Sequence, residues 1–272
     1  MSSGGDAGPR DDSGAVVPVP ARVSRVVSLV PSLTETVAVT APGLVAGATD
    51  WCIHPAGLDV PRVRGTKNPD LGAVIALRPD VVLANEEENR PADLAALRAA
   101  GLPVWVTVIR TLDEALLSLR RLLTVACQLP VPAWLEAAEQ AWKIPDPAAP
   151  APDPAPDPAR AVIPIWRRPW MVLGRDTFAG DVLARLGVAN MYAGHAERYP
   201  KVPLDDLLAA RPDLVVLPDE PYRFTPDDGP ECFPGVPAAL VSGRHLTWYG
   251  PSLAEAPSVL AAQLVGQPHL GL

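Results

Sequence analysis

The first half of the chain reads Leu71-Gly72-Ala73-Val74-Ile75-Ala76-Leu77-Arg78-Pro79-Asp80-Val81-Val82-Leu83. A matching stretch follows at a constant offset of 133 residues and reads Leu204-Asp205-Asp206-Leu207-Leu208-Ala209-Ala210-Arg211-Pro212-Asp213-Leu214-Val215-Val216. Each copy predicts a short helix, an Arg-Pro-Asp turn and then a buried strand. One repeat that spans half of the chain indicates two related lobes rather than a solenoid.

Strands and helices alternate on both sides of these copies. We expect strands at residues 25–30, 44–48, 80–84, 104–108, 161–165, 214–217 and 238–241. We expect helices at residues 71–77, 91–100, 112–127, 132–143, 176–186, 204–210 and 252–264. A further helix should begin at Ser32, which forms a capping box with Glu35. This alternation predicts an α/β fold with mostly parallel sheets and helices on both faces.

Composition excludes several classes of protein. Hydrophobic residues make up 48% of the 272 residues, enough for a sizeable core, so the 34 prolines do not indicate global disorder. A net charge of -8 argues against a nucleic-acid binder, which needs a basic face. Three cysteines do not form a disulfide framework.

The N-terminal residues give the expectation about location. Residues 1–14 are polar and lack the apolar segment of a signal peptide. No run of about 18 or more apolar residues occurs elsewhere, so no transmembrane helix is expected. As written, the sequence predicts a cytoplasmic chain.

Catalytic and metal motifs were sought along the chain. Neither a G-x-G-x-x-G loop, a Walker A loop, a G-x-S-x-G elbow nor an H-E-x-x-H helix occurs. Cys52 and His54 are two residues apart, but the other cysteines and histidines are scattered, which favours isolated residues over a zinc site. We therefore expect no enzyme, no catalytic residues, no metal site and no intrinsic cofactor.

Acidic loops follow the strand of each repeat. The first loop contains Glu86, Glu87 and Glu88, and in the second loop Glu220 matches Glu87 at the offset of 133. Open α/β sheets bind ligands outside the carboxyl ends of their strands, so both loops are candidates for a shared cleft. The carboxylates fit either a cation or acid/base cluster or ordinary solvated loop charge.

Aromatic residues also gather on the predicted loops. Seven tryptophans occur, of which Trp51, Trp166, Trp170 and Trp248 lie outside predicted helices and strands. A cleft rimmed by rigid aromatic rings and a few polar groups suits a large, flat or amphipathic ligand. The alternative is that these rings anchor proline-rich loops.

The order of several motifs resembles the helical-backbone metal receptor superfamily, the substrate-binding proteins of ABC importers for cobalamin, haem and ferric siderophores. The motifs are Pro31-Ser32-Leu33-Thr34-Glu35, Gly47-Ala48-Thr49-Asp50-Trp51-Cys52, Gly65-Thr66-Lys67-Asn68-Pro69, Gly174-Arg175-Asp176-Thr177-Phe178, Tyr199-Pro200-Lys201-Val202 and Leu246-Thr247-Trp248-Tyr249-Gly250-Pro251. They cover about residues 23–265, and their order is most similar to the cobalamin-binding branch.

The resemblance implies two Rossmann-like lobes joined by a long helix, as in class III periplasmic binding proteins. The expected divisions are a disordered tail (1–22), an N-terminal lobe (23–111), a linker helix region (112–144), a proline-rich insert (145–159) and a C-terminal lobe (160–272). The insert holds seven prolines between Pro145 and Pro158 and should be a stiff polyproline-like segment.

The resemblance also implies a ligand and a partner. We expect a monomer that holds a cobalamin-like or ferric chelate between its lobes and has an ABC permease as its partner. The expected ligand-binding residues are Pro31, Trp51, Thr66, Lys67, Asn85, Glu86, Glu87, Trp166, Arg167, Trp170, Tyr199, Glu220, Trp248 and Tyr249.

Two features depart from the family pattern. Thr66, Lys67 and Asn85 stand where cobalamin binders have aromatic rings, which favours a smaller or more polar ligand. Gly72 and Asp205 stand at the positions that dock on the transporter, and only one is acidic. The alternative functions are a cytosolic sensor or enzyme that uses the cleft carboxylates, or an interaction module centred on the proline tract.

Overall fold

The computed structural model describes residues 8–143 and 157–265. These residues form two compact units. Unit 1 holds residues 8–109, 114–136 and 249–251, and unit 2 holds residues 110–113, 137–143, 157–248 and 252–265. Most of the expected proline-rich insert falls outside the described residues, so its conformation stays a prediction.

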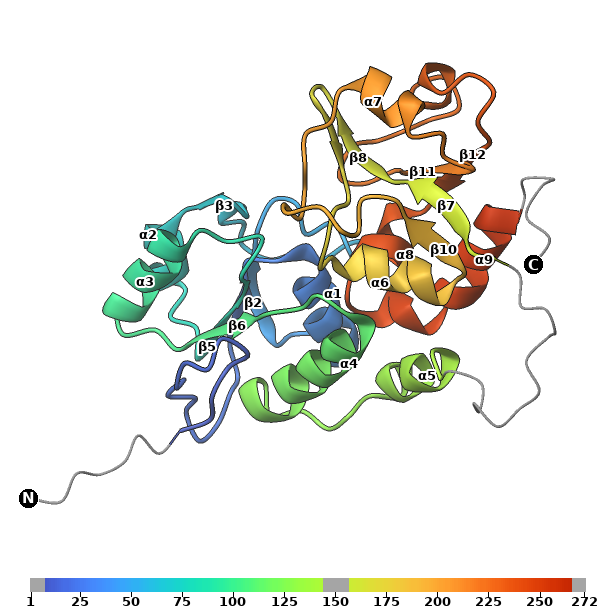
Figure 1. Ribbon diagram of the computed structural model, residues 1–272. Helices are drawn as coiled ribbons and strands as arrows, with labels where there is room; N and C mark the ends of the chain where they lie inside the picture. Colours follow the sequence, from blue (N-terminus) through green and yellow to red (C-terminus); the bar gives the residue numbers. More distant parts are fainter. Residues whose placement is uncertain (1–7, 144–156, 266–272) are drawn as a thin grey trace, which may run out of the picture. The chain divides into compact units, whose positions relative to one another are not determined.

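Unit 1 is built on a parallel sheet of four strands in the order β2-β1-β5-β6 (Figure 1). The strands are β1 (Val26–Ser28), β2 (Val45–Ala48), β5 (Val81–Asn85) and β6 (Val104–Thr107). The helices are α1 (Pro31–Thr40), α2 (Leu71–Ala76), α3 (Pro91–Ala99) and most of α4 (Leu112–Arg121). A short antiparallel hairpin pairs β3 (Arg64–Gly65) with β4 (Asn68–Pro69).

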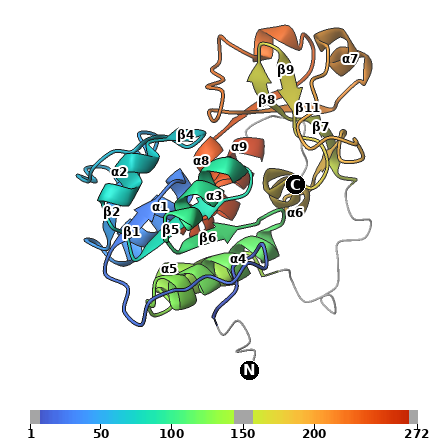
Figure 2. The same ribbon diagram turned by 90° about the vertical axis from the view of Figure 1, so that its left-hand side faces the viewer.

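Helices cover both faces of this sheet, which explains why its strands are apolar on both sides. On one face, Val82 and Val104 pack in a buried cluster with residues of α2 and α3, and these two helices lie together in both views (Figures 1 and 2). Side chains alternate along a strand, so Trp105 points to the other face. There the Arg121 guanidinium of α4 lies 5.6 Å from the centre of the buried Trp105 ring.

The N-terminal segment corrects the prediction of a tail that is disordered to residue 22. Residues 8–22 are ordered against unit 1. The Asp12 N–H donates to Val106 O at 3.1 Å, and the buried Asp11 carboxylate accepts from the Val106 N–H at 3.2 Å. Val106 lies on the edge strand β6, so the segment covers backbone groups that an open sheet edge would expose.

Unit 2 repeats the sheet of unit 1. Its four parallel strands have the order β10-β7-β11-β12, in which the first strand again lies between the second and the third. They are β7 (Ala159–Val162), β10 (Val188–Asn190), β11 (Leu214–Pro218) and β12 (Ala238–Val241), and a hairpin pairs β8 (Pro164–Arg167) with β9 (Trp170–Val172). The helices are α6 (Phe178–Arg185), α7 (Leu204–Ala209), α8 (Gly243–Thr247) and α9 (Ala256–Val265), with 3-10 turns η2 (Pro230–Cys232) and η3 (Pro251–Ala254).

The core of unit 2 lies between the sheet and an aromatic layer. Val162, Val215 and Leu217 of the sheet form a buried cluster with Phe224 and Phe233. Helix α8 contacts both α6 and α9, while α6 contacts the edge strand β10 and α9 contacts the edge strand β12. The sheet therefore positions the loops after β11 and β12, which carry several candidate residues.

The first Arg-Pro-Asp turn joins α2 to β5 and fixes the start of β1. Arg78 adopts a left-handed φ of 46°. The Asp80 carboxylate accepts hydrogen bonds from Ser24 N, Ser24 Oγ and Arg25 N at 2.7, 2.9 and 2.9 Å. The Arg25 guanidinium donates to Leu77 O at the end of α2 at 2.8 Å.

The second Arg-Pro-Asp turn joins α7 to β11 in the same way. Arg211 has a φ of 52°, and the Asp213 carboxylate accepts from Arg160 N at 3.0 Å. The Arg160 guanidinium points back to Ala210 O at the end of α7, 3.4 Å away. The sequence repeat therefore corresponds to a repeated turn that connects the end of a helix to the start of the first strand in both sheets.

The helical connection between the sheets is divided rather than continuous. Helix α4 runs into a π-helical turn, η1 (Leu122–Ala126), and helix α5 (Ala133–Ala141) begins after a break. Pro130 and Pro132 stand in this break, and proline has no N–H with which to continue a helix. The linker helix region therefore holds one continuous helical run, α4 with η1, and the separate helix α5, as the two expected helices at residues 112–127 and 132–143 predict.

The start of α1 also differs from the prediction. Val30 is the N-cap, Pro31 is the first helical residue, and no side chain caps the helix. Ser32 lies inside the helix, and its buried hydroxyl makes no hydrogen bond within the described residues. A proline in the first turn has a favourable φ for a helix start, so the capping box is not needed.

Candidate ligand-binding site

Loops at the carboxyl ends of the strands hold most of the predicted site residues. In unit 1, Pro31 follows β1, Trp51 follows β2 and Asn85 ends β5. The strands are parallel, so these residues lie along one edge of the sheet, where α/β proteins bind ligands. Pro31 is half-buried at the start of α1.

Asn85 organises the loop after β5. Its side chain is 1% exposed and donates to Thr107 Oγ1 at 3.0 Å, while its Oδ1 accepts from Glu87 N at 2.8 Å. Asn89 closes the loop, because its Oδ1 accepts from Asn85 N at 2.9 Å and its Nδ2 donates to Thr66 O at 3.0 Å. Asn85 therefore shapes the loop from within rather than presenting its amide to solvent.

Two charged groups of this loop have different surroundings. The exposed Lys67 of the β3–β4 turn donates from Nζ to Glu87 O. The half-buried Glu88 carboxyl accepts from the Tyr249 hydroxyl at 3.4 Å. Loss of solvation raises the pKa of Glu88 from 4.5 to about 7, although Tyr249 and Lys67 work in the opposite direction. Glu88 is therefore the titratable group of this loop near neutral pH.

Tyr249 corrects one expected boundary. The sequence places it in the C-terminal lobe, residues 160–272, yet Tyr249, Gly250 and Pro251 belong to unit 1. A Cβ at Gly250 would lie 3.0 Å from Thr36 Oγ1 and 3.2 Å from Ser32 O, so the segment passes close against α1. A glycine at this position permits that approach.

Trp51 is the most exposed aromatic side chain of the candidate set. It is 66% exposed on the loop after β2, and Ile53 nearby is 61% exposed. Its indole Nε1 would lie 3.2 Å from a Cβ at Gly65, which places the ring against the β3–β4 hairpin. An exposed apolar ring on a strand-end loop is available to a ligand. Glu86, also predicted for the site, is exposed.

The β8–β9 hairpin carries an aromatic group in unit 2. Trp166 is 42% exposed and meets the Tyr222 ring edge-on at 5.6 Å between centroids. Trp170 stacks on Phe224 at 6.1 Å and contacts Phe233 edge-on at 5.5 Å. Trp170 therefore packs on the core, and Trp166 is the more accessible ring of the hairpin.

Arg167 is held between these rings and two carboxylates. Its guanidinium pairs with Asp228, lies 2.6 Å from Glu231 Oε1 and sits 5.7 Å from the Trp170 ring centre. The Tyr222 hydroxyl donates to Asp228 at 2.7 Å. The charge of Arg167 is thus balanced by neighbouring acids, which identifies it as an anchor of the hairpin.

Glu220 and Trp248 are brought together in unit 2. The indole Nε1 of the buried Trp248 donates to Glu220 Oε2 at 2.8 Å. A Cβ at Gly243 would lie 2.6 Å from both the Cβ and the N of Glu220, so glycine is needed there. The predicted residue Tyr199 contacts its neighbour in sequence, because the Arg198 guanidinium lies 5.6 Å from the centre of the Tyr199 ring.

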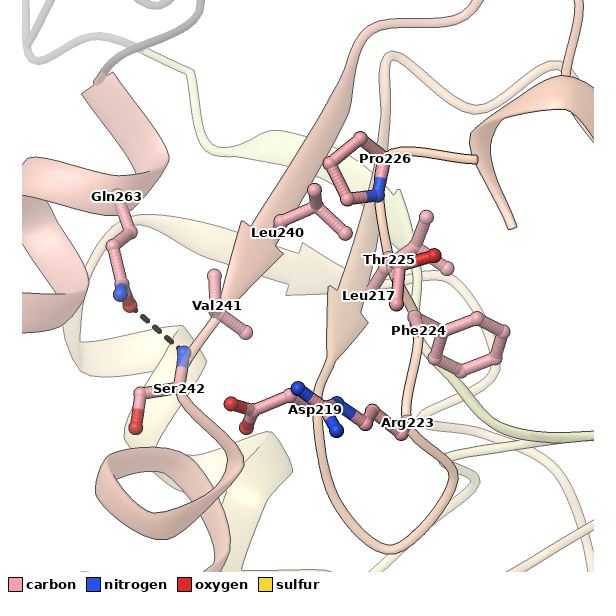
Figure 3. A pocket seen from close by; sticks show the side chains of 10 residues that line it. All are labelled: Leu217, Asp219, Arg223, Phe224, Thr225, Pro226, Leu240, Val241, Ser242 and Gln263. Atoms are coloured by element: carbon pink, nitrogen blue, oxygen red, sulfur yellow. Dashed lines mark hydrogen bonds between the residues drawn. The ribbon is translucent and has the colours of Figure 1, made fainter. Parts of the chain in front are cut away.

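A pocket of about 330 Å³ opens where β11 and β12 end (Figure 3). Its lining residues are Leu217, Asp219, Arg223, Phe224, Thr225, Pro226, Leu240, Val241, Ser242 and Gln263. Gln263 on α9 accepts the Ser242 N–H at 2.9 Å, and Asp219 accepts the Gly243 N–H at 2.6 Å. The lining comes from three separate segments, the end of β11 with its following loop, the end of β12 and helix α9, so no local sequence pattern marks the pocket.

Ser242, His245 and Glu255 form a chain of hydrogen bonds beside this pocket. The Ser242 Oγ lies 2.7 Å from His245 Nδ1, and His245 Nε2 lies 3.1 Å from Glu255 Oε1. Acyl transfer would also need amide donors for an oxyanion, but the Gly243 N–H already donates to the Asp219 carboxylate. The chain of bonds therefore braces α8 against the segment before α9.

Within residues 8–143 and 157–265, no three His, Cys, Asp or Glu side chains gather in a group that suits a metal ion. In the same ranges, no helix combines the length and the apolar character that a bilayer crossing requires.

The family model described as "Periplasmic binding protein" matches residues 26–225, which include strands of both sheets. The chain belongs to the periplasmic binding protein family. The vitamin B12-binding protein of Vibrio cholerae is 24% identical over 200 residues, which cover 73% of this chain and 71% of the relative. The vitamin B12-binding protein of Pectobacterium carotovorum is 23% identical over 245 residues and covers 88% of each chain.

Solved structures share the fold of this periplasmic binding protein. The periplasmic vitamin B12-binding protein BtuF of Vibrio cholerae has a TM-score of 0.69 at 18% identity, covering 90% of this chain and 98% of that chain. Helicobacter pylori CeuE, solved with Ni(II) bound, has a TM-score of 0.75 at 13% identity, covering 94% and 87%. The predicted two-lobed α/β fold and the predicted superfamily are confirmed.

The family corrects the expected location. The polar N-terminal residues predict a cytoplasmic chain, but the family is that of periplasmic binding proteins and BtuF is named as periplasmic. The expectation of a cytoplasmic location is therefore wrong. Its basis, the polar character of residues 1–14, is a local feature that carries less weight than the match over both sheets.

Nine of the fourteen predicted site residues fall into three groups in this periplasmic binding protein. Thr66, Lys67, Asn85 and Glu87 are linked in unit 1, Glu220 is linked to Trp248 in unit 2, and Trp166, Arg167 and Trp170 share the hairpin. Sequence reasoning placed Glu88 in the acidic loop but not in the site. Three consecutive glutamates offer no signal as to which one turns inward.

Proposed function

We propose that this protein binds a metal chelate of the corrin, haem or ferric siderophore class and delivers it to an ABC permease. The family assignment supports a binding protein, and vitamin B12-binding proteins are among its relatives. The 66% exposure of Trp51 on the loop after β2 is the structural observation that carries the ligand proposal.

Trp51 supplies what a flat chelate needs. A rigid ring contributes a large apolar contact area at a low entropic cost. Lys67 and Glu86 are exposed at the same edge of the unit 1 sheet and provide charged groups beside it. These polar groups favour a chelate with acidic or amide substituents over a purely apolar one.

Titration of the purified chain with cyanocobalamin, haemin and a ferric hydroxamate siderophore tests the proposal. Isothermal calorimetry and tryptophan fluorescence should show saturable binding of at least one chelate, with a Kd below about 10 µM. The substitution Trp51→Ala should weaken that binding at least tenfold.

Trp134→Phe is the matched control, because Trp134 lies on α5 and donates from Nε1 to Thr40 Oγ1 at 3.0 Å. It removes a tryptophan from the same fluorescence signal and should leave the Kd unchanged. An absence of heat with all three chelates, or equal affinity in Trp51→Ala and the wild type, would overturn the ligand proposal.

A further inference from the structure

The pocket at the ends of β11 and β12 is the strongest feature that the proposed function does not use. It lies wholly within unit 2, because all ten lining residues belong to that unit. Its volume of about 330 Å³ is at the small end of the range of about 300–1,000 Å³ for ligand pockets. The pocket therefore suits a molecule much smaller than a corrin or a haem.

Opposite charges stand in this pocket without pairing. The Arg223 guanidinium makes no hydrogen bond or ion pair with any residue that the structure describes. The Asp219 carboxylate uses Oδ1 to accept the Gly243 N–H at 2.6 Å, and within the described chain its Oδ2 has no partner. A carboxylate and a guanidinium that share one small pocket and do not pair with each other can bind the two charged ends of a dipolar ligand.

Apolar side chains occupy the other part of the pocket. In Figure 3, Asp219 and Arg223 lie just beyond the end of β11, whereas Leu217 and Leu240 lie on the strands and Pro226 lies on the loop beside Leu240. Leu217 is fully buried and belongs to the core cluster of unit 2, so this wall is fixed in place. The pocket is charged at one end and apolar at the other.

We propose that unit 2 binds a zwitterionic α-amino acid with an apolar side chain in this pocket. Arg223 pairs with the ligand carboxylate, and Asp219 accepts a hydrogen bond from the ligand ammonium. The ligand side chain packs against Leu217, Leu240 and Pro226. This site is independent of the chelate site proposed above, since it shares no residue with the Trp51 loop.

Calorimetry of the full chain with L-leucine and L-phenylalanine tests this site. We expect a Kd below about 1 mM for at least one of them. Isocaproate lacks the ammonium group and isoamylamine lacks the carboxylate, so each should bind at least tenfold more weakly than L-leucine. Glycine has no apolar side chain and should not bind measurably.

Variants locate the binding. Arg223→Gln removes the cation, and Thr225→Trp places a bulky side chain at the lining position Thr225, so each should weaken binding at least tenfold. Arg175→Gln is the matched control, because it removes an exposed cation of unit 2 that pairs with Asp176 outside the pocket. Circular dichroism confirms that each variant is folded.

The possible outcomes separate the two proposals. Failure of both amino acids to give heat up to about 10 mM, or unchanged affinity in both pocket variants, overturns this inference. Trp51→Ala should bind the amino acid like the wild type. If the chelates do not bind but L-leucine binds and depends on Arg223, the proposed function fails while this site stands.

Discussion

The two units share the Arg-Pro-Asp turn before the third strand of each sheet and differ in the loops that follow this strand. In both, an Arg-Pro-Asp turn with a left-handed arginine precedes the third strand, and the aspartate binds the start of the first strand. Beyond the strand, Asn85 and Asn89 close the loop of unit 1, whereas Glu220 bonds to Trp248 in unit 2. The Arg-Pro-Asp turn connects the third strand to the first in both sheets and has the same form in both units. The loops that follow the third strand differ in their contacts, so each unit presents different groups at its strand ends.

The largest loss of stability should come from adding a methyl group at Gly243, which is more tightly packed than Gly250. Gly243→Ala in unit 2 places a Cβ 2.6 Å from the backbone N and the Cβ of Glu220, neither of which can rotate away. We expect the free energy of unfolding to fall by about 3 kcal/mol, as for other overpacked sites. Urea unfolding followed by circular dichroism measures this loss.

Gly250→Ala in unit 1 is the comparison. There the added Cβ would lie 3.0 Å from Thr36 Oγ1, a side-chain atom that can rotate. The expected loss is about 1 kcal/mol. Equal losses in the two variants would show that the two approaches are equally rigid and would contradict this difference between the units.

The shared Arg-Pro-Asp turn should matter more in unit 1 than in unit 2. Asp80 accepts three hydrogen bonds at the start of β1, whereas Asp213 accepts one from Arg160 N. Asp80→Ala should therefore cost about 2 kcal/mol and Asp213→Ala about 1 kcal/mol. Thermal or urea unfolding of the two variants provides the measurement.

Acid offers a second test of Asp80. Burial alone would raise the pKa of this carboxyl, but the hydrogen bonds from Ser24 and Arg25 outweigh it and lower the pKa below 3.8. A lowered pKa stabilises the folded state above the unfolded-state value, and the benefit is lost as the pH falls through the folded value. Asp80→Asn should reduce this loss of stability in acid.

The repeat explains why the fold could be predicted from sequence. A helix, a proline turn and a β-branched strand form a local pattern, and two copies at one offset specify two similar sheets. The parallel sheets and the two related lobes followed from that pattern, whereas the order of the strands came from the structure. The break after α4 was also visible, because Pro130 and Pro132 cannot continue a helix.

The features that the sequence did not predict depend on hydrogen bonds between residues that are distant in sequence. Asp11 and Asp12 belong to a polar segment that resembles a disordered tail, yet they bind backbone groups of Val106 and Val108, about 95 residues away. Tyr249 likewise bonds to Glu88 across 161 residues. No local pattern encodes such contacts, so the ordered N-terminal segment and the inward-turned Glu88 had to come from the structure.

The pH dependence of stability should differ between neighbouring glutamates of unit 1. Glu88 has a folded pKa of about 7 against its usual 4.5, so the unfolded chain releases this proton first as the pH rises. The free energy of unfolding should therefore fall as the pH rises from about 4.5 to about 7, and it should level off at higher pH. Glu88→Gln should remove this slope and be up to about 3 kcal/mol more stable than the wild type at pH 8.

Glu86→Gln is the matched control for that experiment. It removes an exposed carboxyl from the same loop, so the slope of the wild type should persist. Urea unfolding at a series of pH values from 4 to 9, about one unit apart, resolves the two cases. A wild-type slope that survives in Glu88→Gln would assign the titration to another group.

The smallest losses of stability should come from removing the Tyr249 hydroxyl or the Trp248 indole, and the two losses should differ. These adjacent residues each donate to a strand-end carboxyl, Tyr249 to Glu88 at 3.4 Å in unit 1 and Trp248 to Glu220 at 2.8 Å in unit 2. The longer bond is the weaker one, so Tyr249→Phe should cost about 0.5 kcal/mol and Trp248→Phe about 1 kcal/mol. Tyr249→Phe should also raise the pKa of Glu88, since the hydroxyl lowers it. Carbon-detected NMR titration of the Glu88 carboxyl measures that shift, and an unchanged titration would mean that burial and the charge of Lys67, rather than the contact with Tyr249, set the pKa of Glu88.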